Sequence, residues 1–260
     1  MIPKIIHYIW LGGNPIPSAI QECIDSWKRV MPDFKLMLWD DEAIKEIDIL
    51  FVKEALSVKK WAFASDVVRL WALANYGGIY LDTDVKVLRS FEPLLSEHAF
   101  IGREGCMQIN YHTTSYHLTS YCFGAEKENP YIEQCLSYYK NRHFVISNND
   151  SLANELRFDM RNASYIHSEM ARIFGYNPSA LAPSMQRCKN DVLTVFSPEF
   201  FAEGGTSSPN SYCAHLSIGS WRDQEQEKEV YTLGYKISWR MRWIVEKILS
   251  RFGYIMLKLN

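Results

Sequence analysis

Net charge is almost absent from this sequence of 260 residues, because 28 lysines and arginines stand against 30 aspartates and glutamates. A formal charge of −2 gives no overall attraction to nucleic acid, so we expect no nucleic-acid partner. Cysteine is sparse as well, with six residues and no Cys-x-x-Cys pair. This spacing does not match the common zinc and redox motifs, and we expect reduced, mostly buried thiols.

Long hydrophobic runs are also missing. No stretch reaches the roughly 18 to 20 uncharged apolar residues of a membrane-spanning helix, so we expect no such helix. The short apolar run of residues 1–11 is interrupted by His7, and no small-residue cleavage site follows it. This is not the pattern of a secretory signal, and we therefore expect a cytoplasmic protein.

The sequence does contain alternating strand and helix patterns. Residues 4–11 are β-branched and aromatic and stop at Gly12 and Gly13, which predicts a first strand and a turn. Apolar residues at helical spacing over 16–27 predict a helix, and residues 34–39 predict a second strand. A strand, a helix and a strand in this order are typical of an α/β fold.

The middle of the chain continues this pattern. Residues 51–76 contain neither proline nor glycine, which predicts one or two helices that end at Gly77 and Gly78. A short apolar strand is predicted over 79–81. The remaining predicted strands cover 85–88, 99–102, 120–124, 192–196 and 212–217, and the remaining predicted helices cover 130–141, 151–160 and 165–174.

The last residues, 235–260, form a distinct segment in which basic side chains face a single acid, Glu246. Trp239 and Trp243 lie among its many aliphatic residues. A basic helix with tryptophans and a long apolar face suits the headgroup region of an anionic membrane, so we predict a membrane-associating amphipathic helix. The alternative is a C-terminal helix that packs on the core. This divides the chain into a domain of residues 1–234 and a tail.

Asp82 and Asp84 directly follow the predicted strand 79–81. In an extended segment, residues two apart point to the same side, so the two carboxylates are expected to converge. Adjacent carboxylates repel unless a cation or a proton lies between them, and hard oxygen ligands favour Mg²⁺ or Mn²⁺. Such an ion neutralises a diphosphate leaving group. Because ligand sites in open α/β sheets lie beyond strand ends, we prefer this interpretation to a solvated turn.

Four segments in this order resemble a known family. They are Ile2-Pro3-Lys4-Ile5-Ile6-His7-Tyr8-Ile9-Trp10-Leu11-Gly12-Gly13, then Ser65-Asp66-Val67-Val68-Arg69, then Tyr76-Gly77-Gly78-Ile79-Tyr80-Leu81-Asp82-Thr83-Asp84-Val85, and finally His215 with Ser220-Trp221-Arg222-Asp223. Together they resemble glycosyltransferase family 32, which contains yeast mannosyltransferases of the Och type and bacterial capsular polysaccharide transferases. More distantly, they are similar to the large clostridial glucosylating toxins.

The resemblance implies a GT-A type fold, in which a Rossmann-like mixed sheet flanked by helices binds a nucleotide sugar. It implies a retaining transferase that uses Mn²⁺ or Mg²⁺ and moves a hexose or N-acetylhexosamine from a nucleotide diphosphate sugar. UDP-sugars are the leading donors, with GDP-mannose behind them. Together with the basic tail, it implies a lipid-linked oligosaccharide acceptor in capsular or cell-surface polysaccharide synthesis. We therefore expect a peripheral protein on the inner, cytoplasmic face of the plasma membrane.

The resemblance also assigns roles to single residues. Asp66 and Arg69, three apart on one helix face, are expected to hold sugar hydroxyls. Trp10 is expected to stack on the nucleobase, and Thr83 belongs to the donor-binding motif. Without the resemblance, Asp66 and Arg69 are also compatible with an ion pair, and Trp10 is also compatible with a core position.

His215 is expected to supply a third metal ligand through a neutral ring nitrogen, with Ser220 and Trp221 closing over the diphosphate. A satisfied interior histidine is the alternative. The sequence shows no evident nucleophile or general base. A front-face route needs little beyond metal, positioning and charge stabilisation, and a covalent intermediate on Glu104 or Glu126 stays open.

The sequence departs from the bacterial family members at two places. Leu216 stands where a second histidine often follows the first, and Ser120-Tyr121-Cys122 replaces the more usual Asn-Thr-Gly run. Sugar or acceptor specificity is expected to differ accordingly.

Two other functions stay open. A phosphatase of the haloacid dehalogenase class also places two aspartates at a strand end, but Lys86 stands where that class has Thr or Val. A non-catalytic, sugar-binding scaffold subunit of an envelope assembly predicts neither metal dependence nor nucleotide binding. Titration of a nucleotide sugar with and without Mn²⁺ distinguishes this scaffold from the transferase.

Overall fold

A computed structural model describes residues 1–105, 108–109, 114–179, 182–203 and 207–219 of the chain. The predicted tail and its boundary after residue 234 lie outside the described residues. Among the helices that are described, none combines the length and the apolarity that crossing a bilayer requires.

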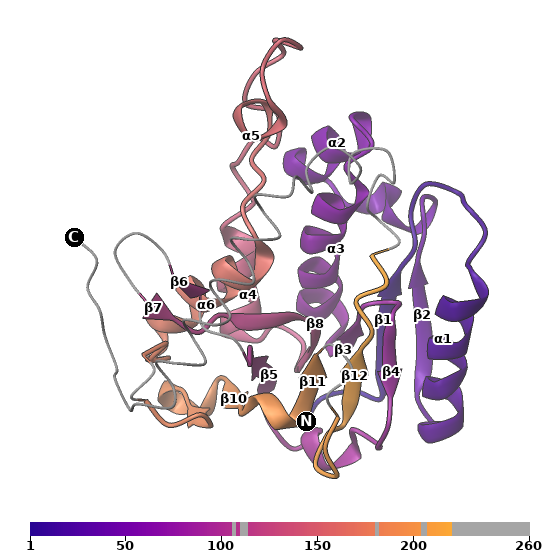
Figure 1. Cartoon of the computed structure of the whole chain (residues 1–260), viewed down its shortest axis with the longest axis vertical. Coiled ribbons are helices and arrows are strands. Elements are labelled where there is room, and N and C mark those ends of the chain that lie inside the picture. Colours follow the sequence, from indigo (N-terminus) through magenta and orange to yellow (C-terminus); the bar gives the residue numbers. More distant parts are fainter. Residues whose placement is uncertain (106–107, 110–113, 180–181, 204–206, 220–260) are drawn as a thin grey trace, which may run out of the picture. The chain divides into compact units, whose positions relative to one another are not determined.

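A seven-stranded mixed sheet lies at the centre of the described part, in the order β2-β1-β3-β8-β5-β10-β9 (Figure 1). β1 is parallel to β2 and β3, and β5 is parallel to β10, whereas β8 is antiparallel to both β3 and β5. The strands are β1 (Ile5–Ile9), β2 (Lys35–Trp39), β3 (Gly78–Leu81), β5 (Ala99–Arg103), β8 (Leu118–Ala125), β9 (Gln186–Arg187) and β10 (Thr194–Phe196).

Helices cover both faces of this sheet. One face carries α2 (Leu50–Ser57), α3 (Trp61–Tyr76), α4 (Pro130–Ser137) and α6 (Ala163–Ile173), and the other carries α1 (Ser18–Val30). Alternating residues of β3 show the two layers, because Tyr80 packs with the first group of helices whereas Ile79 and Leu81 pack with α1. The predicted α/β class, with a mixed sheet flanked by helices, is confirmed.

A three-stranded sheet of β11 (Phe201–Glu203), β12 (Cys213–His215) and β4 (Val85–Val87) lies beside α1. The indole nitrogen of Trp27 in α1 donates to the carbonyl of Val85 at 2.7 Å. A two-stranded ribbon of β6 (Gln108–Ile109) and β7 (Thr114–Ser115) completes the described strands. Sequence patterns did not predict β6, β7, β9 or β11, which have only two or three residues each.

Two consecutive glycines turn α3 directly into β3. Gly77 has a φ of 64° and Gly78 a φ of 114°, both in the region that favours glycine. A Cβ on Gly77 would lie 2.7 Å from the backbone nitrogen of Lys127, and one on Gly78 would lie 2.7 Å from the carbonyl oxygen of Ile5. The predicted end of the helix at this pair is confirmed, and this tight turn sets where β3 ends.

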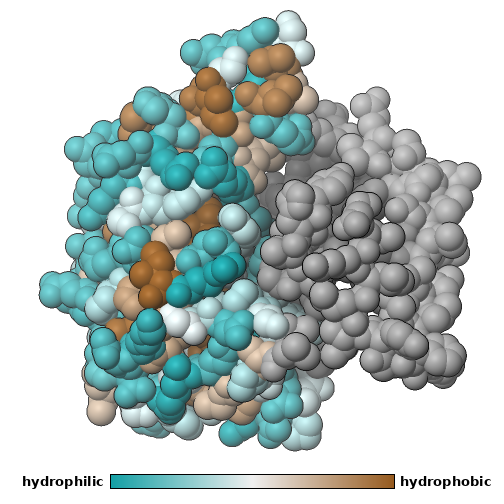
Figure 2. Space-filling model, turned by 90° about the vertical axis from the view of Figure 1, so that its left-hand side faces the viewer, coloured by the Kyte–Doolittle hydropathy of each residue, from teal (hydrophilic) through white to brown (hydrophobic). Residues whose placement is uncertain are grey.

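The predicted helix over 151–160 is wrong in its length, because α5 covers only Asn154–Arg157. Phe158 leaves the helix to form an antiparallel bridge with Val145, so the segment is a short two-stranded stem with a helical turn. Figure 2 shows hydrophobic surface at the top of the molecule, in the region of α5. Ile146 and Leu156 are 62% and 60% exposed there.

The carboxyl ends of β1, β3 and β5 lie at the same edge of the central sheet, since these strands are parallel to one another. Trp10 follows β1, Asp82 follows β3, and Arg103 ends β5. Ligands of open α/β sheets bind at such an edge. The fold therefore places residues from distant parts of the sequence at one candidate site.

Candidate active site

Asp82, Thr83 and Asp84 form a turn between β3 and β4. The backbone N–H of Val85 donates to the carbonyl of Asp82 at 3.0 Å, which closes the turn. The prediction that these residues continue an extended segment is therefore wrong. The chain must turn here because β3 belongs to the central sheet and β4 to the small one.

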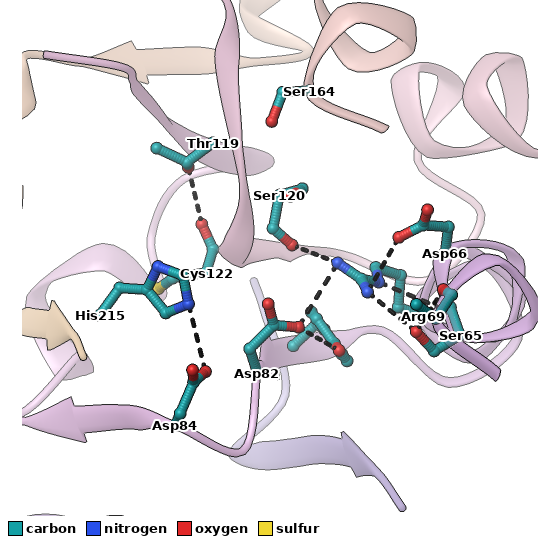
Figure 3. Close-up of polar contacts among 12 residues, drawn as sticks. Ser65, Asp66, Arg69, Asp82, Asp84, Thr119, Ser120, Cys122, Ser164 and His215 are labelled. Atoms are coloured by element: carbon teal, nitrogen blue, oxygen red, sulfur yellow. Dashed lines mark hydrogen bonds and ion pairs between the residues drawn. The ribbon is translucent and has the colours of Figure 1, made fainter. Parts of the chain in front are cut away.

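The carboxylates of Asp82 and Asp84 nevertheless converge, together with the imidazole of His215. One ligand atom from each residue lies within 4.8 Å of the other two. The Nε2 atom of His215 is 3.2 Å from a carboxylate oxygen of Asp84 (Figure 3). Strand pairing explains this proximity, because His215 at the end of β12 is directly opposite Val85.

Asp84 is held from the same side by the segment that follows β12. Its second carboxylate oxygen accepts the backbone N–H of Ile218 at 2.9 Å, and its carbonyl accepts the N–H of Leu216 at 3.0 Å. Burial raises the pKa of Asp84, but the contacts with His215 and Ile218 outweigh burial and hold this pKa below its ordinary value. The Asp84 side chain is therefore poised as an ionised ligand.

Burial lowers the pKa of His215, but the hydrogen bond and charge of Asp84 outweigh it, so the net pKa is raised. The neighbouring carboxylates thus favour a proton on His215. A divalent cation would take the place of this proton, because a histidine ligand is neutral. Two carboxylates and one imidazole suit Mn²⁺, and they leave coordination positions for phosphate oxygens and water. The residues fit the predicted metal.

Arg69 lies behind Asp82 and is almost entirely buried. Its guanidinium is 3.0 Å from Asp66 and 3.5 Å from Asp82, and it donates to the carbonyl of Ser120 at 2.7 Å (Figure 3). Two further bonds go to Ser65. The Arg69 guanidinium therefore binds protein partners and forms the ion pair with Asp66 that was the alternative interpretation of the sequence. Its direct contact with a sugar stays a prediction.

Asp66 has a side chain that is 17% exposed and lies next to this buried cation. Burial raises its pKa, the charge of Arg69 lowers it and the charge of Asp82 raises it, with a net value of about 6. Arg69 therefore offsets only part of the cost of burying the Asp66 carboxylate. Asp66 therefore keeps its proton to a higher pH than an ordinary aspartate.

Tyr80 supplies a contact that sequence patterns did not assign. Its hydroxyl donates to Oδ1 of Asp82 at 2.5 Å, and the Arg69 guanidinium lies 4.5 Å from its ring centre. The spacing of Tyr80 and Asp82, two apart at a strand end, carries a weak signal for this contact. Tyr121 also contacts the site, because its ring stacks on His215 and its carbonyl accepts the N–H of Asp82, and no sequence pattern indicates either contact.

The other predicted donor-binding residues are less well defined. Trp10 is half-buried at the sheet edge, and its indole nitrogen donates to the carbonyl of Asn14 at 2.6 Å. Thr83 is half-buried in the turn between the two aspartates. Ser220 and Trp221 lie outside the described residues.

A covalent intermediate was predicted to be possible on Glu104 or Glu126, and the prediction for Glu126 is wrong. Ala125 pairs with Gly78 at the start of β3, whereas Asp82 follows the end of that strand. At about 3.3 Å per residue, this separates Glu126 from the aspartate pair by more than 10 Å. Glu126 instead pairs with His98. Glu104 follows β5 at the correct edge of the sheet, and its role stays a prediction.

Comparison with known proteins agrees with this geometry. Residues 17–101 match the family model described as a glycosyltransferase sugar-binding region containing a DXD motif. This range holds Asp66, Arg69 and both aspartates of the turn, but neither Trp10 nor His215. The chain therefore carries the sugar-binding region of a DXD-type glycosyltransferase. Its resemblance to glycosyltransferase family 32 is confirmed.

Two similar proteins come from Schizosaccharomyces pombe. Inositol phosphoceramide mannosyltransferase 3 is 39% identical over 110 residues, which cover 39% of this chain and 30% of that protein. Inositol phosphoceramide mannosyltransferase 1 is 30% identical over 158 residues, which cover 55% of this chain and 46% of that protein. The alignments thus span less than half of these relatives. The solved structure of the PaToxG glycosyltransferase is similar with a TM-score of 0.47 and 21% identity, over 66% of this chain and 69% of that one.

Proposed function

We propose that this chain is a metal-dependent glycosyltransferase that transfers a hexose or N-acetylhexosamine from a nucleotide diphosphate sugar. The observation that carries this proposal is the convergence of Asp82, Asp84 and His215 within 4.8 Å. The three side chains come from two sheets and meet at the edge where a nucleotide is expected to bind. The match to a DXD sugar-binding region supports the same class of reaction.

Asp82, Asp84 and His215 would hold Mn²⁺ or Mg²⁺, which when bound stabilises the negative charge of the departing diphosphate. The N–H of Ile218 and the hydroxyl of Tyr80 orient the two carboxylates. Such orientation ahead of binding is the protein's main contribution in a front-face retaining route, in which the chain supplies positioning rather than a nucleophile.

Asp66 is the candidate for contact with the sugar itself. When ionised, its carboxylate accepts hydrogen bonds from hydroxyl groups, and a pKa of about 6 leaves it ionised at pH 7 and above. Arg69 holds Asp66 and Asp82 at fixed positions relative to each other, because it forms an ion pair with both. A sugar bound by Asp66 would therefore lie near the metal ligands.

The acceptor we propose is a hydroxyl group of a lipid-linked glycan. The names of the two fission-yeast relatives, which describe mannose transfer to inositol phosphoceramide, support a lipid-borne acceptor. They also support testing GDP-mannose beside UDP-glucose, UDP-galactose and UDP-N-acetylglucosamine. Capsular or cell-surface polysaccharide synthesis remains our proposal for the biological setting.

The test is release of nucleoside diphosphate from these four donors, with Mn²⁺ or with a chelator. We expect release from at least one donor with Mn²⁺ only, and loss of release in Asp84→Asn. A matched control is Asp150→Asn, because Asp150 is 87% exposed on the segment before α5. No release and no binding of any of the four donors, with or without Mn²⁺, would favour the sugar-binding scaffold instead.

We also propose that the protein is peripheral on the cytoplasmic face of the plasma membrane. The support is the composition of residues 235–260, which are basic and rich in tryptophan and aliphatic side chains. Truncation after Gly234 is expected to abolish sedimentation with liposomes that contain anionic lipid. Sedimentation of the truncated protein at the level of the full chain would contradict this role.

A further inference from the structure

Tyr121 lies in β8 of the central sheet, and its side chain contacts the small sheet. It is 5% exposed. Its ring stacks on the imidazole of His215, with ring centres 4.4 Å apart and an interplanar angle of 14°. Its backbone carbonyl accepts the N–H of Asp82 at 2.8 Å. One residue thus contacts two of the three candidate ligands.

A third contact ties Tyr121 to the small sheet. Its hydroxyl donates to the carbonyl of Phe201 in β11 at 2.9 Å. β11 pairs with β12, and Phe201 is directly opposite Cys213, two residues before His215. The small sheet therefore holds the hydroxyl end of the Tyr121 side chain. The same sheet carries His215, whose imidazole stacks on the face of the Tyr121 ring.

The relative position of Asp82 and His215 needs such a link, because the two residues belong to different sheets. Asp82 follows β3 of the central sheet, whereas His215 ends β12 of the small one. Asp84 lies between them in the chain and already contacts His215. From this geometry we infer that Tyr121 is a positioning residue for the metal centre, which fixes the plane of the His215 ring relative to Asp82.

A histidine side chain can rotate about both of its χ angles unless neighbouring groups hold it. A stacked, immobile ring restricts the rotation of the imidazole and keeps its Nε2 atom directed at Asp84 and the cation position. Groups that orient metal ligands without touching the metal typically contribute 10-fold to 100-fold to affinity.

This inference rests on the proposed metal-dependent function, and its test measures metal binding directly. Mn²⁺ is titrated into the full-length protein without nucleotide, and free Mn²⁺ is followed by its electron paramagnetic resonance signal. We expect Tyr121→Leu to raise the Kd for Mn²⁺ about 10-fold or more. Tyr121→Phe keeps the stacked ring and loses only the bond to Phe201, so a smaller rise is expected.

Tyr131→Leu is the matched control for loss of a buried tyrosine. Tyr131 is 1% exposed, its hydroxyl donates to the carbonyl of His167 at 3.4 Å, and its ring lies 6.4 Å from the His167 ring. Both leucine variants are expected to unfold at lower temperature than the wild type. Only Tyr121→Leu is expected to lose Mn²⁺ affinity, which separates positioning from general destabilisation.

A double-mutant cycle with His215→Gln tests whether Tyr121 acts through the histidine. We expect Tyr121→Leu to weaken Mn²⁺ binding less in the His215→Gln protein than in the wild type. Equal Mn²⁺ affinity in the wild type and Tyr121→Leu would overturn the positioning role of Tyr121 but not the proposed metal centre. An equal effect of Tyr121→Leu in the wild type and in the His215→Gln protein would do the same. A wild-type protein that binds no Mn²⁺ would overturn both the inference and the proposed metal centre.

Discussion

The buried carboxylate of Asp66 predicts a specific dependence of stability on pH. Its pKa in the folded protein is about 6, against an ordinary value of 3.8. A gap of about two pKa units corresponds to roughly 3 kcal/mol. Well below pH 3.8 the residue is protonated in both the folded and the unfolded state and has no effect. As the pH rises towards 6, the unfolded state releases its proton first, so the folded state loses stability.

The perturbation is Asp66→Asn, which removes this titration while keeping the shape of the side chain. The free energy of unfolding is measured by urea denaturation with tryptophan fluorescence, in the presence of a chelator, between pH 4 and pH 8. Comparison of the two proteins at each pH cancels the contributions of other titrating groups. We expect the wild type to lose roughly 2 kcal/mol relative to the variant between pH 4 and pH 7, because a smaller part of the loss occurs below pH 4. A difference that is constant over this range, or that changes in favour of the wild type, would refute the argument.

Three further substitutions test the surroundings of the site. Tyr80→Phe removes the hydrogen bond to Asp82 and is expected to weaken Mn²⁺ binding about 10-fold without a change in the folded structure, as followed by titration and circular dichroism. Gly78→Ala forces a Cβ to within 2.7 Å of a backbone oxygen at a φ of 114°, so the free energy of unfolding should fall by more than about 1 kcal/mol, and an unchanged urea midpoint would count against this strain. Trp27→Ala empties a fully buried position and is expected to cost about 3 to 5 kcal/mol in the same measurement.

Local patterns in the sequence were sufficient for the longer elements. α1 lies close to residues 16–27, where helical spacing predicted it, and α2 and α3 occupy the stretch 51–76, which lacks proline and glycine and ends at Gly77. The strands of the central sheet also follow apolar runs. The short strands of the small sheet and the length of α5 depend on distant partners, such as Val145 for Phe158, and no local pattern encodes these.

In the candidate site, too, local patterns predicted some features, whereas others depend on distant parts of the chain. The spacing of Asp82 and Asp84 and the family resemblance predicted a cluster with His215, and this cluster is present. The reason given for it, an extended segment, was wrong, because a turn joins two different sheets at this point. Tyr121 could not be predicted, since its contact with His215 depends on how β8 and β12 lie in space.

Binding of UDP and GDP, measured by isothermal titration calorimetry with Mn²⁺ and with a chelator, shows whether Asp82, Asp84 and His215 form the metal and diphosphate site. We expect the wild type to bind one of these nucleotides in the presence of Mn²⁺ and to lose this binding with the chelator. We expect Asp84→Asn, which should stay folded, to show no binding under either condition. Nucleotide binding that is equally tight without metal, or in Asp84→Asn, would contradict the assignment of this cluster as the metal and diphosphate site.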